Sequence, residues 1–166
     1  MVSENKSAVA VVMGSDSDMG VMKSCIEMLK EFGIEPEVRI ISAHRTPHVA
    51  VEFAANAAGA GKKIIIAAAG MAAHLAGAMA AQSMLPIIGV PMVSGDMGGL
   101  DALLSTVQMP PGVPVATMAV GKAGAKNAAV FAVEVLALSD KDLAGKLVQF
   151  RKTQQEKVIA KDSAVR

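Results

Sequence analysis

Ala8-Val9-Ala10-Val11-Val12-Met13 runs directly into Gly14-Ser15-Asp16-Ser17-Asp18. The first six residues are all apolar, which is typical of a β-strand that is covered on both faces. The second segment breaks this run, and apolar residues then recur at helical spacing from Met22 to Phe32. A buried strand, a polar turn and an amphipathic helix in this order predict a parallel α/β unit.

The same alternation continues along the chain. Further strands are predicted at about 37–41, 63–68, 86–90 and 115–120, and helices at 47 to about 59 or 61, 75–84, 100–107, 123–138 and 141–160. Right-handed crossovers then give a five-stranded parallel sheet with helices on both faces, and the common strand order is 2-1-3-4-5. We expect one domain over residues 1–166, with a core at about 8–140 and an additional C-terminal helix at about 141–160.

Composition narrows the class of protein. The chain has 166 residues and a net charge of +1, so no overall field attracts nucleic acid or an anionic membrane. Tyr and Trp are absent and Phe numbers 4, which leaves few rings for stacking bases. The hydrophobic fraction is 52%, much of it small residues and Met, and we interpret this as an oligomer that buries additional surface.

Three segments bear on the cellular location. The single cysteine, Cys25, excludes an internal disulfide, fits a reducing compartment and lies at helical spacing among apolar residues, as a core thiol would. The polar residues 1–7 do not resemble a signal peptide. Residues 64–81 are apolar apart from His74, but Ala and Gly dominate them, so a strand, loop and helix are favoured over a membrane span. A cytoplasmic protein is expected.

Polar chemistry is concentrated in the loops after the first three strands, at 14–18, 42–47 and 70–74. In the expected strand order these loops meet at one edge of the sheet, where such folds bind ligands. Ser15 and Ser17, with backbone N–H groups at a helix start, suit an anion, and Arg45 can grip a phosphate with two hydrogen bonds. Asp18 is either a helix N-cap or an acceptor for the hydroxyls of a sugar. The implied ligand is a nucleoside monophosphate or similar ribotide.

The remaining loop residues point to proton transfer in a dry pocket. His44 can give and take protons near neutral pH. The segment Gly70-Met71-Ala72-Ala73 allows backbone to approach a flat ligand, whereas His74 taken alone is more typical of a helix N-terminal surface residue. His48 is interpreted as a solvated residue, and Ser94 and Asp96 as rim residues. There is no Walker lysine or GxGxxG spacing, and no cluster with metal-ligand spacing.

Four segments, 13–18, 42–47, 72–75 and 107–115, together resemble the N5-carboxyaminoimidazole ribonucleotide mutases of purine biosynthesis. The resemblance implies a flavodoxin-like three-layer αβα fold and a homo-octamer assembled with the help of C-terminal helices. It also implies conversion of N5-carboxyaminoimidazole ribonucleotide to 4-carboxy-5-aminoimidazole ribonucleotide, without cofactor or metal.

The resemblance also implies roles for individual residues. His44 is the general acid and base, Ser15 and Arg45 bind phosphate with help from Ser42, and Asp18 holds the ribose. Backbone from Gly70 to Ala72, with His74 nearby, cradles the carboxylate and the imidazole ring. The other substrate contacts expected are Ser17, Ala43, Met71 and Leu75.

The chain departs from the family pattern after its third strand. Family members usually read Gly-Gly-Ala-Ala-His-Leu-Pro-Gly there, whereas Met71 replaces the second glycine, Ala76 replaces the proline and Ala68 stands where glycine is common. Two alternatives stay open: a related enzyme that carboxylates aminoimidazole ribonucleotide directly with CO2, and a ribotide-binding module without catalysis. Arg45 and the loop Gly70-Met71-Ala72-Ala73-His74 favour the mutase over the direct carboxylase. A phosphoreceiver would need an aspartate where Gly70 stands, and a dehydrogenase an acidic residue after the second strand.

Overall fold

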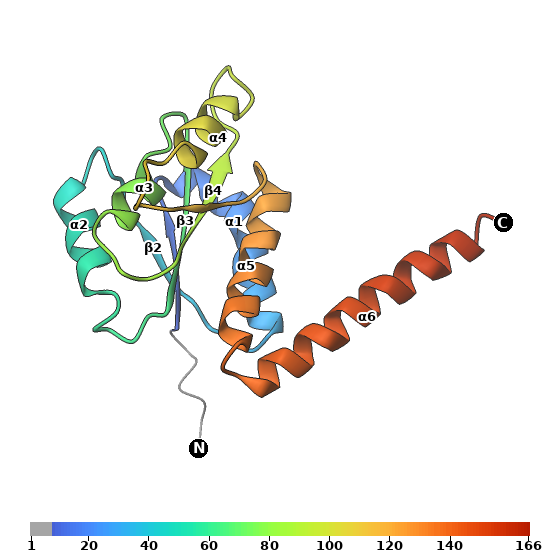
Figure 1. The fold of residues 1–166 in the computed structure, drawn as a ribbon. Coiled ribbons are helices and arrows are strands. Elements are labelled where there is room, and N and C mark those ends of the chain that lie inside the picture. Colours follow the sequence, from blue (N-terminus) through green and yellow to red (C-terminus); the bar gives the residue numbers. More distant parts are fainter. Residues whose placement is uncertain (1–7) are drawn as a thin grey trace. The chain divides into compact units, whose positions relative to one another are not determined.

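The structure is a computed structural model that describes residues 8–166 (Figure 1). The polar N-terminal segment, residues 1–7, lies outside the described residues. The chain divides into two compact units, one ending at Ala132 and one spanning Val133–Arg166. Each unit is described by itself below.

The first unit is built on a five-stranded, all-parallel sheet of order β2-β1-β3-β4-β5, which confirms the predicted topology. Its strands are β1 (Val9–Met13), β2 (Glu37–Ile40), β3 (Ile64–Gly70), β4 (Ile87–Met92) and β5 (Ala116–Thr117). Every residue of β1 is buried, as its unbroken apolar sequence predicted. The register sets Met13 beside both Ile40 and Ala68, so the carboxyl ends of β1, β2 and β3 lie next to one another.

Helices cover both faces of this sheet. They are the 3-10 turn η2 (Asp16–Asp18), α1 (Met19–Glu31), α2 (Pro47–Asn56), α3 (Leu75–Ala80), α4 (Leu100–Val107) and the part of α5 (Lys122–Ala137) that precedes residue 133. On one face, α2 and α3 close over a core that includes Val12 and Ile65. On the other face lies α1 (Figure 1), whose Cys25 is fully buried, and burial raises the pKa of this thiol to about 12. The result is the expected three-layer αβα sandwich.

Several element boundaries differ from the prediction. Helix α2 ends at Asn56 rather than at about residue 59 or 61, because the chain leaves the helix in hydrogen-bonded turns that lead to β3. Strand β4 extends through Pro91 and Met92 because β3 continues to Gly70 and pairs with it there. Strand β5 is two residues long rather than the predicted 115–120, and it pairs only with Ile88 and Gly89 at the edge of the sheet. Helix α3 ends at Ala80 instead of residue 84, and the chain continues as hydrogen-bonded turns toward β4.

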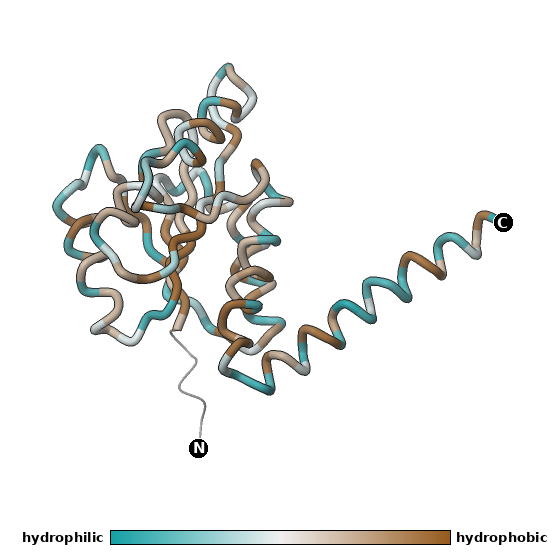
Figure 2. Tube along the Cα trace, in the orientation of Figure 1, coloured by the Kyte–Doolittle hydropathy of each residue, from teal (hydrophilic) through white to brown (hydrophobic). Residues whose placement is uncertain are grey.

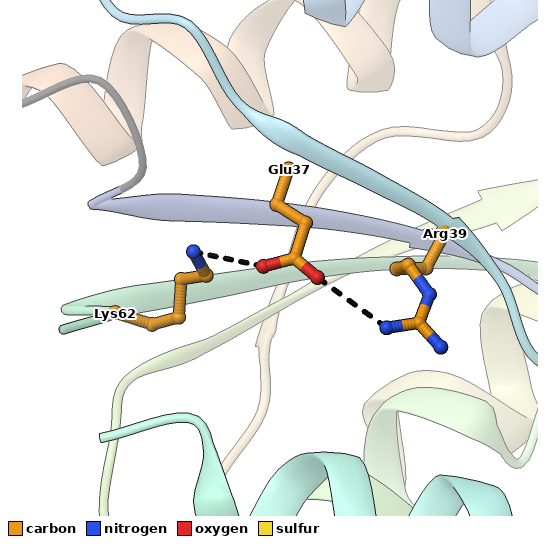
Figure 3. Close-up of polar contacts among 3 residues, drawn as sticks. All are labelled: Glu37, Arg39 and Lys62. Atoms are coloured by element: carbon orange, nitrogen blue, oxygen red, sulfur yellow. Dashed lines mark hydrogen bonds and ion pairs between the residues drawn. The ribbon is translucent and has the colours of Figure 1, made fainter. Parts of the chain in front are cut away.

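An ion pair between Glu37 and Lys62 (Figure 3) stabilises the start of β2 and β3. It lies at the opposite end of the strands from the loops 14–18, 42–47 and 70–74. The Lys62 ammonium donates to the Glu37 carboxylate at 2.8 Å, and the Lys62 side chain is only 5% exposed. Arg39 lies 3.4 Å from the same carboxylate, and its guanidinium also lies over the Phe53 ring, 5.3 Å from the centroid. The hydrogen bond from Lys62 lowers the pKa of Glu37 against the opposing effect of partial burial.

The second unit contains the end of α5 and the predicted C-terminal helix, α6 (Lys141–Ser163). The Asp140 carboxylate caps α6 by accepting the N–H groups of Asp142 and Leu143, both at 3.0 Å. Apolar positions recur among polar ones along α6 (Figure 2), and Val148, at 71% exposure, is the most exposed large apolar residue on it. Nowhere in residues 8–166 does a helix combine the length and the hydrophobicity that crossing a bilayer requires.

Candidate active site

A cavity of about 400 Å³ opens at the carboxyl ends of β1, β2 and β3. The loops 14–18, 42–47 and 70–74 contribute most of its lining, so the structure brings together the three segments expected to converge. All the predicted site residues line it: Ser15, Ser17, Asp18, Ser42, Ala43, His44, Arg45, Gly70, Met71, Ala72, His74 and Leu75. Gly14, Ala69 and Ser94 line it as well.

The first loop holds two hydroxyls close together. Ser15 Oγ caps η2 by accepting the Ser17 N–H at 3.3 Å, and the Ser17 hydroxyl donates to it at 2.9 Å. The Gly14 N–H donates to the Ala68 carbonyl at 3.0 Å, which ties the loop to the end of β3. The loop therefore presents hydroxyl groups at the start of a helical segment, an arrangement suited to an anionic oxygen.

Asp18 occupies the N-cap position of α1, but its side chain makes no capping hydrogen bond. The structure therefore does not support the capping alternative, and the serine three residues earlier performs that function for η2 instead. Asp18 is only 7% exposed, and burial raises the pKa of its carboxyl, with the neighbouring Asp16 adding to the rise and a backbone hydrogen bond at Ser15 opposing it. A partly desolvated carboxylate at the cavity is well suited to accept hydrogen bonds from hydroxyl groups of a ligand.

The second loop is stabilised by its own side chains. Thr46 Oγ1 donates to the Ser42 carbonyl at 2.9 Å and accepts the Ser42 N–H at 3.0 Å, and Ser42 Oγ accepts the Arg45 N–H at 3.1 Å. The Arg45 guanidinium donates through Nη2 to the Gly14 carbonyl at 3.1 Å. This bond crosses from the second loop to the first, so the cation is attached to the loop that carries the two serine hydroxyls.

The two candidate histidines are hydrogen-bonded to each other. His44 Nε2 lies 2.9 Å from His74 Nδ1, with the rings edge to face at 84° and their centroids 5.0 Å apart. One of the two nitrogens must carry the proton and the other must accept it, so the hydrogen bond links the tautomers of the two rings. His74 is thus a direct partner of His44, a role that its sequence context alone did not indicate. His48 is exposed and lies outside the cavity lining, consistent with its interpretation as a solvated residue.

The third loop is strained where it departs from the family pattern. Met71 has φ +56°, and it is the only non-glycine residue with positive φ among residues 8–166. A positive φ disfavours residues with a Cβ. This is a physical reason for the glycine that the family pattern has at this position. Gly70 is constrained differently, because a Cβ on it would lie 1.8 Å from Ser94 Oγ.

Ser94 enters the cavity lining from the end of β4, whereas Asp96, the other expected rim residue, does not line it. Ser94 Oγ is buried and has no hydrogen-bond partner among residues 8–166. The sequence indicated Ser94 as a rim residue because it follows the predicted fourth strand. Within the same described range, no group of three His, Cys, Asp or Glu side chains comes together as metal ligands.

Comparisons with known proteins agree with this geometry. Residues 8–157 match the sequence profile of the family described as AIR carboxylase. A protein of Vibrio vulnificus named N5-carboxyaminoimidazole ribonucleotide mutase is 49% identical over 152 residues, covering 92% of this chain and 94% of the relative. One of the same name from Escherichia coli K12 is 46% identical over 155 residues, covering 93% and 92%. The crystal structure of Treponema denticola PurE superposes with a TM-score of 0.84 at 32% identity, covering 93% of this chain and 96% of that one. The chain therefore belongs to the AIR carboxylase family.

Proposed function

We propose that this protein is an N5-carboxyaminoimidazole ribonucleotide mutase that moves a carboxyl group from nitrogen to carbon within a bound ribotide. The observation that carries the proposal is the hydrogen-bonded pair of His44 and His74, 2.9 Å apart, in the cavity that Arg45 and Asp18 also line. Proton donors and acceptors therefore lie beside groups suited to a phosphate and a sugar. Relatives named for this reaction are nearly half identical over almost the whole chain.

Each of the three loops contributes to binding a different part of the ribotide. The phosphate lies against the hydroxyls of Ser15 and Ser17 and the Arg45 guanidinium, with Ser42 orienting the arginine through its 3.4 Å contact with Nε. Asp18 accepts hydrogen bonds from the ribose hydroxyls. The heterocycle and its carboxylate lie against the third loop, where backbone from Gly70 to Ala72 and the side chains of Leu75 and Ala43 surround it.

The chemistry needs one acid and base near the heterocycle. His44, protonated, gives its proton to the carbamate nitrogen; the nitrogen keeps the electron pair of the breaking C–N bond and CO2 is released. The electron-rich C4 of the aminoimidazole then attacks CO2 to form the C–C bond, and neutral His44 removes the proton from C4. The imidazole ends the cycle in its initial state, as a general acid and base must.

The third loop keeps the two halves of this reaction together. Small apolar residues around the heterocycle exclude water and hold CO2 close to C4, so that the second step is effectively intramolecular. His74 stabilises one tautomer of His44 through the hydrogen bond between the two rings. No cofactor or metal takes part in this scheme.

The proposal extends to assembly and location. We propose a homo-octamer, supported by the apolar side chains that α4 and α6 expose, among them Leu100, Leu104 and Val158. Light scattering should give a mass close to eight times 17.0 kDa, and a monomer would contradict this part. A cytoplasmic location fits the single buried cysteine and a phosphorylated substrate. Neither nucleic acid nor a membrane is a partner.

The deciding experiment supplies the purified protein with two substrates separately. With N5-carboxyaminoimidazole ribonucleotide, we expect the C4-carboxylated isomer to accumulate. Aminoimidazole ribonucleotide with dissolved CO2 should react far more slowly. Preferential turnover of the second pair would favour the direct carboxylase, and tight binding of both ribotides without turnover would favour a ribotide-binding module.

A further inference from the structure

Ser105 of α4 lies outside the cavity lining but holds one of the loops that form it. Its Oγ accepts the Ala73 N–H at 2.9 Å and donates its proton to the Asp101 carbonyl at 2.7 Å. The Met71 carbonyl lies 3.4 Å from the same oxygen. One hydroxyl therefore joins a helix to the backbone of the third loop, across 32 residues of sequence.

The segment that Ser105 holds leads directly to the histidine pair. The His74 N–H donates to the Ala72 carbonyl at 2.8 Å, which closes a three-residue turn centred on Ala73. Ala73 is 1% exposed, so without Ser105 its N–H would be buried with no acceptor. The next residue, His74, presents Nδ1 to His44 Nε2 at 2.9 Å. A single peptide therefore separates the Ser105 hydrogen bond from the residue that contacts the proposed acid and base.

The third loop needs an external restraint because its own sequence resists the observed conformation. Met71 is held at φ +56°, which an L-residue with a Cβ adopts only when its surroundings impose it. The adjacent Thr106 also contacts Ala73, with Oγ1 3.5 Å from the Ala73 carbonyl, and it makes a shorter 2.7 Å bond to the Ala102 carbonyl. Ser105 thus supplies the shorter of the two side-chain contacts between α4 and Ala73.

We infer that Ser105 is a positioning residue that acts through Ala73 to set the His74 imidazole against His44. Ser105 touches neither substrate nor reacting atoms. Its hydroxyl fixes the geometry of the His44–His74 pair through the hydrogen bond to the Ala73 N–H. The inference rests on the proposed function only for its kinetic consequences, because the geometry of the two imidazoles is measurable without any substrate.

The chain offers a matched control. Ser24 is also a helix serine, and its hydroxyl donates to the Val21 carbonyl at 2.7 Å within α1. It is buried, whereas Ser105 is half-buried. Replacing either serine by alanine removes a hydroxyl that donates to a carbonyl of its own helix, but only Ser105→Ala also removes the acceptor of a loop N–H. Ser105→Thr keeps the hydroxyl and should restore the behaviour of the unmodified protein.

The direct test records NMR spectra of the imidazole groups in full-length protein labelled at histidine, without ligand. The chain contains 3 histidines, and the exposed His48 serves as an internal reference. In Ser105→Ala we expect the signals and titration curves of His44 and His74 to change while those of His48 do not. Ser24→Ala should match the unmodified protein. Unchanged signals of His44 and His74 in a folded Ser105→Ala protein would overturn the inference. If the alanine variant does not fold, Ser105→Cys, with only a weak sulfur acceptor, gives the same comparison.

Kinetics provide the second readout. Ser105→Ala should lower kcat roughly tenfold, because a small displacement of the histidine pair disfavours proton transfer, with KM within about twofold because the phosphate and ribose contacts lie on other loops. The pH profile of kcat should also change. A loss of activity that merely follows the unfolded fraction, equal in Ser24→Ala, would overturn the inference. If the unmodified protein shows no mutase activity, the proposed function fails, and the spectra still decide the positioning role.

Discussion

Two carboxylates at opposite ends of the sheet experience contrasting environments. Glu37, at the start of β2, is paired with the buried Lys62 ammonium at 2.8 Å, and this hydrogen bond lowers its pKa (Figure 3). Asp18, in the cavity at the ends of the strands, has no ion-pair partner among residues 8–166, and burial raises its pKa. The two groups have the same chemistry and lie in the same fold, so the difference reflects what each end of the sheet provides.

The contrast extends beyond these two groups. The cavity end also contains the strained Met71 and the Ser94 hydroxyl, which has no hydrogen-bond partner among residues 8–166. At the other end, ion pairs and a cation–π contact join the residues that we call the Glu37 corner: Glu37, Lys62, Arg39 and Phe53. Unsatisfied polar groups and strained backbone cost stability, and they persist where a ligand makes use of them. We therefore expect substitutions at the cavity to change activity more than stability, and substitutions at the Glu37 corner to do the reverse.

The largest effect is expected for His44→Asn. Loss of the acid and base should lower kcat by about 10³-fold, within the usual range for general acid–base catalysis. Binding of aminoimidazole ribonucleotide, measured by calorimetry, should change only a few-fold, because the phosphate and ribose contacts remain. The matched control is His48→Asn, which alters an exposed histidine outside the cavity and should retain full activity. Normal turnover in His44→Asn would remove the proposed mechanism.

Asp18→Asn should separate stability from binding. Because the folded protein has a raised Asp18 pKa, ionisation of this group is unfavourable for folding; the penalty is absent below its ordinary pKa of 3.8 and complete above the folded value. At neutral pH the variant should gain about 1 kcal/mol, or ~2–4 °C in Tm. It should lose about tenfold or more in affinity for the ribotide, since a charged hydrogen-bond acceptor is lost.

The control for Asp18→Asn is Asp16→Asn, which changes an exposed carboxylate in the same turn. It should alter neither Tm nor ribotide affinity appreciably. An Asp18→Asn protein that melts at a lower temperature than the unmodified one would show that the carboxylate is a stabilising group, and the contrast with Glu37 would not hold.

Glu37→Gln should have the opposite profile. It leaves the Lys62 ammonium without its anionic partner and should cost about 2 kcal/mol in the free energy of unfolding, less than for a fully buried pair because Glu37 is 34% exposed. Because the pKa is lowered in the folded state, the stabilisation is complete above the ordinary pKa of 4.5 and disappears as the pH falls through the folded value. Urea unfolding at neutral and acidic pH measures both effects.

Glu35→Gln is the control for this corner. Glu35 pairs with Lys30 at 2.8 Å, but both side chains are about half exposed, so its loss should cost at most about 0.5 kcal/mol. The activity of folded Glu37→Gln protein should equal that of the unmodified protein. Reduced kcat in that variant, measured well below its melting temperature, would mean that the two ends of the sheet are coupled.

The smallest effect is expected for Met71→Gly. Removing the Cβ at φ +56° relieves strain of roughly 1–2 kcal/mol, and the greater freedom of glycine in the unfolded chain offsets part of this, so a net gain of about 0.5 kcal/mol should appear in urea unfolding. We also expect higher turnover. Met71→Ala distinguishes the causes: it shortens the side chain but keeps the strain, so equal gains in both variants would assign the effect to crowding rather than to backbone strain.

The sequence predicted the fold because each part of it carries a local signal. The unbroken apolar run at Val9–Met13 and the alternation of strands and helices define the parallel sheet, and the sheet order then brings three distant loops together. The limits of β4 and β5 were not predictable, because they depend on how far the neighbouring strand extends and on pairing at the sheet edge. Local patterns do not contain that information.

At the cavity, residue types were predictable but their contacts were not. The loop positions of His44 and Asp18 indicated the site, yet whether Asp18 caps a helix depends on the rotation of one side chain. The pairing of His44 with His74 joins residues 30 apart, and the Ser105 bond to Ala73 joins a helix with no chemical motif to a loop. Such contacts arise from tertiary packing, so only the structure reveals them.

The most direct test of the mechanism follows the carboxyl carbon itself. N5-carboxyaminoimidazole ribonucleotide labelled with ¹³C in its carboxylate, incubated with the protein in unlabelled bicarbonate buffer, should yield product that carries the label at the C4 carboxylate. His44→Asn should yield none on the same timescale. Product without label would show that CO2 exchanges with solvent, and label transfer at the normal rate without His44 would show that another group moves the proton; either result would contradict the account.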